Sequence, residues 1–384
     1  MFFRGLLKGA DKKVFSKKRK HKEPVIQTAV SDGYDRGLYS YFTAGGCERR
    51  LYKQLRDNVP IIDAAIYKIV RLIGGFRIEC NDKKLQQQLN NFLDTVPVGA
   101  SGIGIDSFLS VFTEQLLLYG TAVGEIVPDI TGTRIAGLYN SNLDNVELCK
   151  GDDPFGVNIY AASGGIRIPV KYPSLILYSA LMPEPDSVYG TSLLRGLPFV
   201  SDVLMKIFRA TGTNWDRIGN VRFSVSYKPG ENERAFSKER AKIIASEWSK
   251  AMKSREPRDF VTVGDVSIKV IGADNQIPDS EIPVRQLLEQ IVAKLSIPPF
   301  LLGLSWSTTE RMSSQQADIL TSELEYYRRC LGGIINRLCT VYLKLGGYRD
   351  SVKIVWDNIN LQDEVELARA RLYNAQAEKT ERGN

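Results

Sequence analysis

An apolar helical pattern of unusual length lies in the last quarter of the sequence. Its large apolar residues recur every three or four positions, which places them on one face of an α-helix. They are Ile319, Leu320, Leu324, Tyr327, Leu331, Ile334, Ile335, Leu338 and Val341. Ser307 and Glu310 form a capping box before this pattern, and Gly346 ends it. At 1.5 Å per residue such a helix is about 55 Å long, so we expect an elongated protein.

A second amphipathic helix precedes the long one and is stopped by two prolines. It opens near Ser280, carries apolar residues up to Leu295, and meets Pro298 and Pro299, which cannot continue a helix. The stretch from Gly303 to Ser313 is largely polar. The chain is therefore expected to turn sharply between two rigid helices.

The remaining patterns predict short helices mixed with strands. The expected helices are 58–73, 82–94, a helix from Asp106 to Tyr119, a helix from Leu193 to about Trp215, 237–253, and a last charged helix from about Asp363. The expected strands are 76–80, 121–127, a small antiparallel sheet within 130–180, 221–227, 260–271 and 352–356. Residues 23–50 are expected to be largely irregular. We therefore assign an α+β fold class.

Composition limits the environment in which the chain works. The 384 residues are 43% hydrophobic and 25% charged, as in ordinary globular proteins. The five cysteines show no C-x-x-C pair, and their odd number argues against a secreted disulfide framework. No apolar run reaches the roughly 18 residues that a membrane span requires, and no signal-peptide core opens the chain. We expect folding in a reducing cytoplasm and no membrane partner.

The positive charge is concentrated in an N-terminal arm, residues 1–22. The arm carries nine Lys or Arg against one acid, Asp11, which leaves 42 basic and 43 acidic residues, a net charge of −1, in the rest of the chain. Its basic cluster is Lys12, Lys13, Lys17, Lys18, Arg19, Lys20 and Lys22. Two interpretations stay open, a solvated disordered tail or a segment that touches DNA, scaffold or capsid.

The sequence offers little to catalysis. With His21 as the single histidine, His-based triads and His-rich metal sites are excluded. No Walker A motif is present, and Gly102 to Ser107 is interpreted as a flexible linker because no clear strand precedes it. The paired acids Asp152 and Asp153, and Glu184 with Asp186, are interpreted as solvated loop carboxylates. We expect no enzyme activity, no cofactor and no metal.

Four segments, in their order along the chain, resemble the portal proteins of tailed double-stranded DNA bacteriophages. They are the helix from Asn58 to Gly75, "LLLYGTAVGEIV" from Leu116 to Val127, "SVYGTSLL" from Ser187 to Leu194, and "LLEQIVAKLSIPPFLLG" from Leu287 to Gly303. No single segment is specific to that family. Their joint order is what carries the resemblance.

The resemblance implies a division of the chain into the parts of a portal subunit. The expected parts are a basic arm 1–22, the first part of the wing 23–190, a stem helix 191–216, a clip 217–275, a second stem helix 276–300, a tunnel loop 301–312, a long wing helix and strand 313–362, and a short crown 363–384. The crown, with about twenty residues after Asp363, is shorter than is usual in the family.

The resemblance also implies a function, partners and a candidate site. We expect a ring, usually dodecameric in the family, at one capsid vertex of the virion, assembled in the host cytoplasm. Through it DNA is packaged and ejected; its further partners are terminase, major capsid and scaffold proteins, and a head–tail adaptor. The candidate DNA-channel loop is Ser305, Trp306, Ser307, Thr308, Thr309, Glu310 and Arg311. Trp306 has a second interpretation, as a packing residue between neighbouring subunits.

Two other functions remain as alternatives at this point. One is a DNA-processing enzyme such as a nuclease with a basic arm, and the other is a monomeric nucleic-acid-binding module. Either is expected to run as a monomer or small oligomer, whereas a portal requires a large closed ring. A channel must let DNA slide, and a body of nearly zero net charge suits this because each phosphate contact adds affinity.

Overall fold

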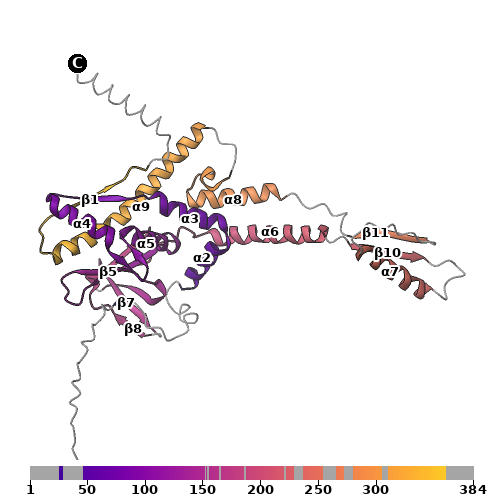
Figure 1. The fold of residues 1–384 in the computed structure, drawn as a ribbon, viewed down its shortest axis with the longest axis horizontal. Coiled ribbons are helices and arrows are strands. Elements are labelled where there is room, and N and C mark those ends of the chain that lie inside the picture. The colour runs from indigo at the N-terminus through magenta and orange to yellow at the C-terminus, as the bar shows by residue number, and fades with distance from the viewer. Residues whose placement is uncertain are drawn as a thin grey trace, which may run out of the picture. The chain divides into compact units, whose positions relative to one another are not determined.

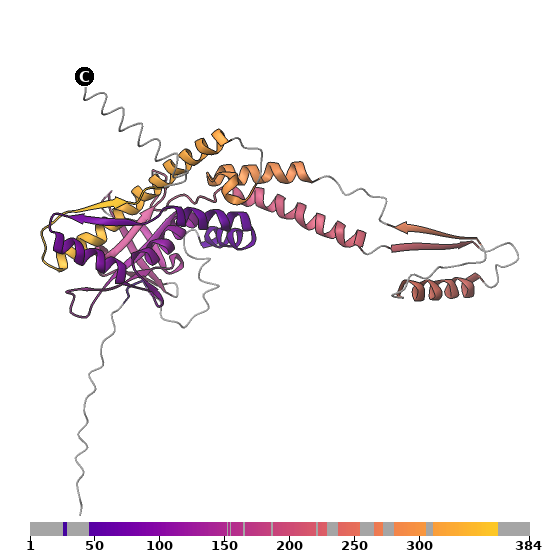
Figure 2. The same cartoon turned by 45° about the horizontal axis from the view of Figure 1, so that its top comes forward.

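The computed structural model divides the chain into two compact units. Unit 1 contains residues 1–195 and 294–384, and unit 2 contains residues 196–293. The described residues are 26–28 and 46–359, except 152, 154, 164–165, 186, 220–221, 229–236, 254–264, 272–279 and 305–309. Figures 1 and 2 show both units as ribbons, and each unit is considered by itself.

The helices of unit 1 pack on one another and on its strands. They are α2 (Gly46–Asn58), α3 (Pro60–Leu72), α4 (Lys83–Thr95), α5 (Ile105–Tyr119) and α9 (Glu310–Leu345). Pro60 begins α3, where its missing N–H costs nothing. The helix α5 packs against α2, α3 and α4, and its Phe108, Phe112, Leu116 and Leu117 are fully buried as their spacing predicts.

Unit 1 also contains a five-stranded sheet in which β4 lies between β5 and β9. The strand order is β3 (Gly102–Ile103), β2 (Pro97–Val98), β5 (Ile135–Asn140), β4 (Thr121–Pro128) and β9 (Ile176–Ala180). The pairing is antiparallel except between β2 and β5. Seven of the eight residues of β4 are buried, so this strand lies inside the unit.

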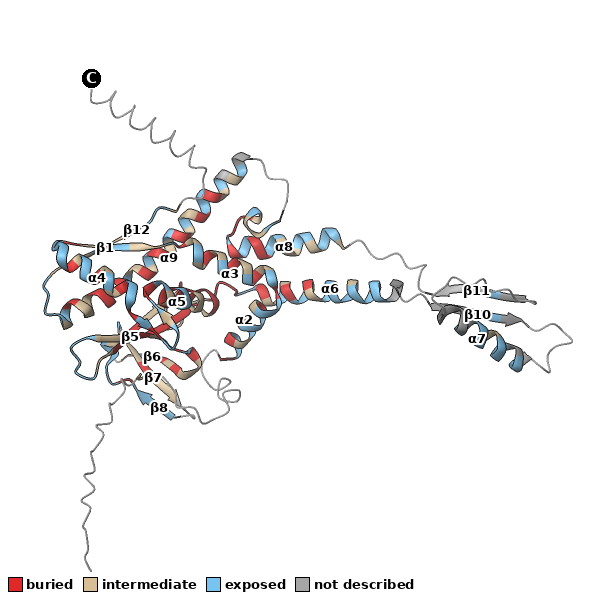
Figure 3. Cartoon of the chain, in the orientation of Figure 1, coloured by how far each residue is buried: buried red, intermediate tan, exposed pale blue. Residues whose placement is uncertain are grey.

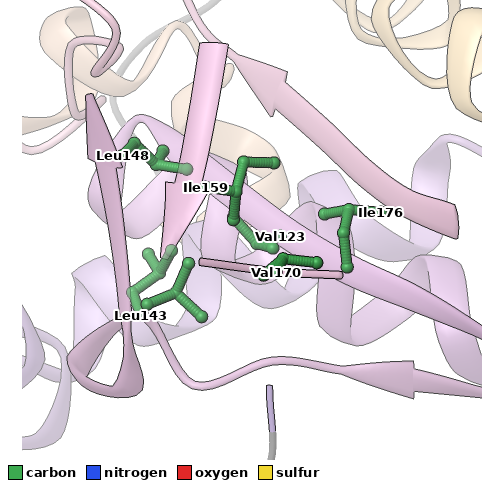
Figure 4. Packing of buried hydrophobic residues seen from close by; sticks show 7 residues of the cluster. Val123, Leu143, Leu148, Ile159, Val170 and Ile176 are labelled. Carbon is green, nitrogen blue, oxygen red and sulfur yellow. The ribbon is translucent and has the colours of Figure 1, made fainter. Parts of the chain in front are cut away.

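A smaller antiparallel sheet covers part of the first. It contains β6 (Val146–Lys150), β7 (Val157–Ser163) and β8 (Ile166–Pro169). Figure 4 shows its apolar side chains, among them Leu148 and Ile159, converging on Val123 of β4 and Ile176 of β9. The expected antiparallel strands between residues 130 and 180 are confirmed, though they belong to two sheets.

The long helix α9 and the strand after it contact elements near the start of unit 1. The ribbon β1 (Phe76–Cys80) pairs antiparallel with β12 (Val352–Trp356), with Phe76 opposite Trp356. The buried Arg328 of α9 donates from Nε and Nη2 to the carbonyl oxygen of Ile73 at 2.8 and 2.6 Å, and its guanidinium lies 5.2 Å from the Trp356 ring centroid. Arg328 therefore caps the C-terminal end of α3.

Unit 2 contains helices and one two-stranded ribbon. Its elements are α6 (Leu197–Gly219), β10 (Arg222–Lys228), α7 (Ser237–Lys253), β11 (Asp265–Ile271) and α8 (Glu281–Leu295), whose last two residues belong to unit 1. The strands pair antiparallel from Arg222 opposite Ile271 to Lys228 opposite Asp265. Figure 3 shows that much of α6 is exposed. Two of its aromatic side chains, Phe208 and Trp215, are 48% and 62% exposed.

Several expectations from the sequence are wrong in detail. Residues 46–50, expected to be irregular, form the start of the helix α2. The helix expected from Leu193 begins at Leu197, because Ser192 and the next residues form turns first. Residues 102–107 are not a flexible linker: β3 pairs with β2, and Gly104 at φ 81° leads directly into α5.

Candidate functional site

Most of the candidate site residues lie outside the described residues. Ser305, Trp306, Ser307, Thr308 and Thr309 fall outside the described residues, as do the basic arm and the segment 360–384. Glu310 and Arg311 form the first turn of α9, and their side chains are not described. The capping box, the channel loop and the crown helix therefore stay predictions.

The chain on the N-terminal side of the loop is firmly folded. After α8 ends, Ser296 adopts a φ of 53°, in the left-handed region that residues other than glycine rarely enter. The chain therefore turns at this residue. Pro299–Leu302 then form the 3-10 helix η4, which packs against α3. Gly303, at φ 75°, donates its N–H to the Phe300 carbonyl at 3.2 Å and terminates η4.

The chain on the C-terminal side of the loop is equally well anchored. Ala317, Leu320 and Leu324 of α9 are buried. Arg337 further along the helix donates from Nη2 to the carbonyls of Pro173 and Ser174 at 3.1 and 3.3 Å. Residues 305–309, which lie outside the described residues, thus join two anchored segments, η4 and α9. The described elements follow the order that the sequence predicts, with one helix before the two prolines and a second helix after the loop.

Two Tyr-Gly-Thr motifs, 70 residues apart, meet in unit 1. They are Tyr119-Gly120-Thr121, between α5 and β4, and Tyr189-Gly190-Thr191, shortly before the chain leaves the unit. The N–H of Gly190 donates to Thr121 Oγ1 at 2.9 Å. The N–H of Leu181 donates to the Gly120 carbonyl at 2.7 Å, and that of Thr191 to the Leu181 carbonyl at 2.7 Å. We call this arrangement the Tyr-Gly-Thr junction.

The Tyr-Gly-Thr junction requires glycine at both central positions. A Cβ added to Gly190 would lie 2.0 Å from the Gly120 carbonyl oxygen and 2.4 Å from the Leu181 nitrogen. Gly120 has a φ of 73°, and a Cβ there would lie 2.5 Å from the Gly190 carbonyl. Two backbone segments therefore touch where neither can carry a side chain. The sequence shows both glycines but not that they meet.

Hydroxyl groups complete the junction. Ser192 Oγ donates to the Leu118 carbonyl at 2.6 Å and accepts from the Leu194 N–H at 3.0 Å. The Tyr189 hydroxyl accepts from the Leu148 N–H at 3.0 Å. Burial raises the pKa values of Tyr119 and Tyr189 above the ordinary value, so both stay protonated near neutral pH.

The acidic residues considered for catalysis are not brought together in the described part of the chain. Glu184 forms an ion pair with Arg195 at 2.9 Å, and Asp153 caps a turn by accepting the Phe155 N–H at 3.1 Å. Asp152 and Asp186 lie outside the described residues. Among the described residues, no three His, Cys, Asp or Glu side chains gather as metal ligands would. No described helix is both long enough and apolar enough to cross a membrane.

One interaction was missed by the sequence reasoning. Glu125 stands in the middle of the apolar strand β4 and is fully buried, and its carboxylate accepts hydrogen bonds from Gln27 and Thr28. A charged residue inside a buried strand was the available signal, because a buried charge requires hydrogen-bond partners.

Solved structures share this fold. No model of a protein family and no curated protein matches the sequence. A chain in the virion of a native gene transfer agent particle aligns with a TM-score of 0.64 at 15% identity, covering 85% of this chain and 88% of that one. A chain in the neck of the native particle, computed with C12 symmetry, aligns with a TM-score of 0.60 at 16% identity, covering 82% and 85%.

A third solved structure is a HK97-family phage portal protein from Corynebacterium diphtheriae. It aligns with a TM-score of 0.45 at 12% identity, covering 79% of this chain and 93% of that one. The chain shares the fold of the gene transfer agent virion and neck chains. The α+β fold class expected from the sequence is confirmed, whereas the function has to be argued from the residues, because a shared fold does not fix a function.

Proposed function

We propose that the chain is the portal subunit of a tailed phage or phage-like particle. In this role it forms a ring at one capsid vertex, through which double-stranded DNA is packaged and ejected. The ring docks terminase during packaging and a head–tail adaptor afterwards, and contacts capsid and scaffold proteins. The observation that carries the proposal is the shared fold over 82% of the chain with a neck component computed with C12 symmetry.

The exposed aromatic residues of α6 support assembly into a ring. Phe208 and Trp215 are seven positions apart, so they lie on the same side of the helix, and both are about half exposed or more in the single chain. Burying a large apolar side chain contributes about 1.5–3 kcal/mol. Contact with neighbouring subunits would supply that burial at every interface of a closed ring.

The same proposal gives each part of the chain a role. Unit 1 would contain the wing, α6 and α8 the stem, and the β10–α7–β11 segment the clip. Residues 305–309, four hydroxyl residues and Trp306, would form the tunnel loop, because they join η4 to α9 where both flanking segments are held. The near-neutral charge outside the arm suits a channel through which DNA must slide.

Mass measurement tests the ring directly. The purified chain is 43.0 kDa, so a dodecamer has a mass of about 516 kDa, and native mass spectrometry with negative-stain microscopy should reveal a ring with a central opening. Phe208→Ser with Trp215→Ser should lower ring yield, whereas Ile243→Ser, a control at an exposed position of α7, should not. A chain that stays monomeric at micromolar concentration refutes the proposal.

Loop deletion tests the channel role. Removing residues 305–309 should leave ring formation intact, since the buried faces of α9 and η4 remain, and should impair DNA packaging or retention. A control replaces Thr131 and Thr133 by Ser in the β4–β5 turn, a polar turn of unit 1, and should package normally. Normal packaging by the deletion variant would place the loop at an outer rim.

A nuclease assay separates the portal from the enzyme alternative. We expect no DNA cleavage with Mg²⁺ or Mn²⁺, because no described cluster of acids could hold a metal pair. Metal-dependent cleavage that disappears in Asp152→Asn with Asp153→Asn would replace the portal proposal by a nuclease.

A further inference from the structure

The carboxylate of Glu125 is buried in the centre of unit 1. Glu125 lies on β4, between β5 and β9, with none of its surface exposed to solvent. Removing a carboxylate from water is costly unless hydrogen-bond donors replace the solvent. The partners of this side chain are therefore part of the fold.

All three donors to this carboxylate, within the described residues, come from a two-residue segment almost 100 positions away. The N–H of Gln27 donates to Oε1 at 2.9 Å, and the N–H of Thr28 donates to Oε2 at 3.1 Å. The Thr28 hydroxyl lies 2.9 Å from the same Oε2 and donates to it. Bonds to an ionised acceptor are the stronger kind.

Two further contacts hold the same segment. Thr28 Oγ1 lies 2.7 Å from Ser141 Oγ, just after β5, and the Tyr172 N–H donates to Gln27 Oε1 at 3.0 Å. Thr28 is itself fully buried. Gln27 and Thr28 thus contact β4, the end of β5 and the chain before β9, a spread of contacts that a loosely attached tail does not make.

We propose that Gln27 and Thr28 form a clasp that fastens the basic arm to unit 1 at Glu125. The last basic residue of the arm, Lys22, is five positions before Gln27. The arm therefore starts from one fixed point on the body, and whatever acidic surface it contacts must lie within its reach from that point. This inference is independent of the portal proposal, because it rests on the contacts of Glu125 alone.

Two truncations distinguish the clasp from the arm. Deleting residues 1–22 removes the charge and keeps the clasp, so the thermal midpoint should stay within about 1 °C of that of the full chain. Deleting residues 1–28 leaves the buried carboxylate without donors and should lower the midpoint by at least about 5 °C. Equal midpoints for the two truncations would overturn the proposal.

A substitution at Glu125 provides a second, charge-specific test. In the full chain, Glu125→Gln replaces an acceptor by an amide that faces donors, so it should lower the midpoint. In the chain that lacks residues 1–28, the same substitution removes an uncompensated buried charge and should raise the midpoint. A change of the same sign in both backgrounds contradicts the clasp.

A disulfide trap tests the contact with a readout other than stability. In a Cys47→Ser background, which removes an exposed thiol, Thr28→Cys with Ser141→Cys should form a disulfide within one chain, because the two hydroxyls lie 2.7 Å apart. Non-reducing electrophoresis should reveal a monomer of altered mobility that neither single variant gives. A disulfide between chains, or none, would overturn the clasp within one subunit.

Discussion

Gly190→Ala adds a single methyl group and is nevertheless expected to lower the stability of unit 1 strongly. It adds one methyl group at the Tyr-Gly-Thr junction, 2.0 Å from the Gly120 carbonyl oxygen and 2.6 Å from the Leu181 carbonyl oxygen. Both neighbours are backbone atoms, so no side chain can rotate away. Two of the hydrogen bonds of the junction, at Gly190 and Leu181, must lengthen as the two backbone segments separate.

The expected cost follows from these contacts. Loss of two largely buried hydrogen bonds costs about 1–3 kcal/mol, and overpacking adds about 1–3 kcal/mol, which gives about 2–6 kcal/mol in total. At about 2–4 °C per kcal/mol for a large domain, the thermal midpoint of unit 1 should fall by at least about 4 °C.

Differential scanning calorimetry measures this loss, and a second glycine in unit 1 supplies the control. Gly333→Ala lies within α9, where an added Cβ meets nothing within 4 Å, and should stabilise the helix by about 0.5–1 kcal/mol. The two variants make the same chemical change with opposite expected signs. A Gly190→Ala midpoint within 1 °C of the wild type would refute the reasoning from backbone contact.

Three further predictions concern α9, the cysteines and the arm. Arg328→Met should destabilise the protein by about 1.5–3 kcal/mol because it leaves the Ile73 carbonyl without its charged donors, whereas Arg329→Met, at the exposed neighbouring position, should change calorimetric stability little. At pH 8, iodoacetamide should modify the exposed Cys47 within minutes and spare the buried Cys339, since burial raises the pKa of Cys339 to about 12. Mass spectrometry of the labelled, folded protein identifies the modified cysteines, and modification of both would contradict the packing of α9. Deleting residues 1–22 should flatten the dependence of DNA affinity on salt, measured by fluorescence anisotropy, because the arm carries a net charge of +8; an unchanged slope would place the DNA contacts elsewhere.

Helical and strand patterns could be predicted from the sequence wherever local chemistry decides them. The helix expected at 237–253 and the strand at 352–356 agree with α7 and β12 at both ends, because caps and apolar alternation fix such boundaries locally. The helix α2 was missed because its mean hydropathy is low and its first five residues are Gly, Cys, Glu and two Arg.

Contacts between distant segments could not be predicted in the same way. Nothing near Glu125 in the sequence indicates that its partners are Gln27 and Thr28, and nothing near Arg328 points to the carbonyl of Ile73. Such pairs depend on how the whole chain folds back on itself. Buried Glu and Arg residues within apolar patterns indicate that partners exist, but the fold alone decides which residues they are.

The structure also explains how this fold can be shared with a gene transfer agent chain at 15% identity. Most of unit 1 is held by helix packing and by strand pairing, which accept many apolar residues of suitable size. Few positions depend on one residue type, and the Tyr-Gly-Thr junction is the clearest, since Gly120 and Gly190 touch through their backbones. Both of these glycines fall within the short segments on which the sequence resemblance rests. Short motifs can therefore carry a resemblance where whole-chain identity is low, because they mark the places where the backbone leaves no room for a side chain.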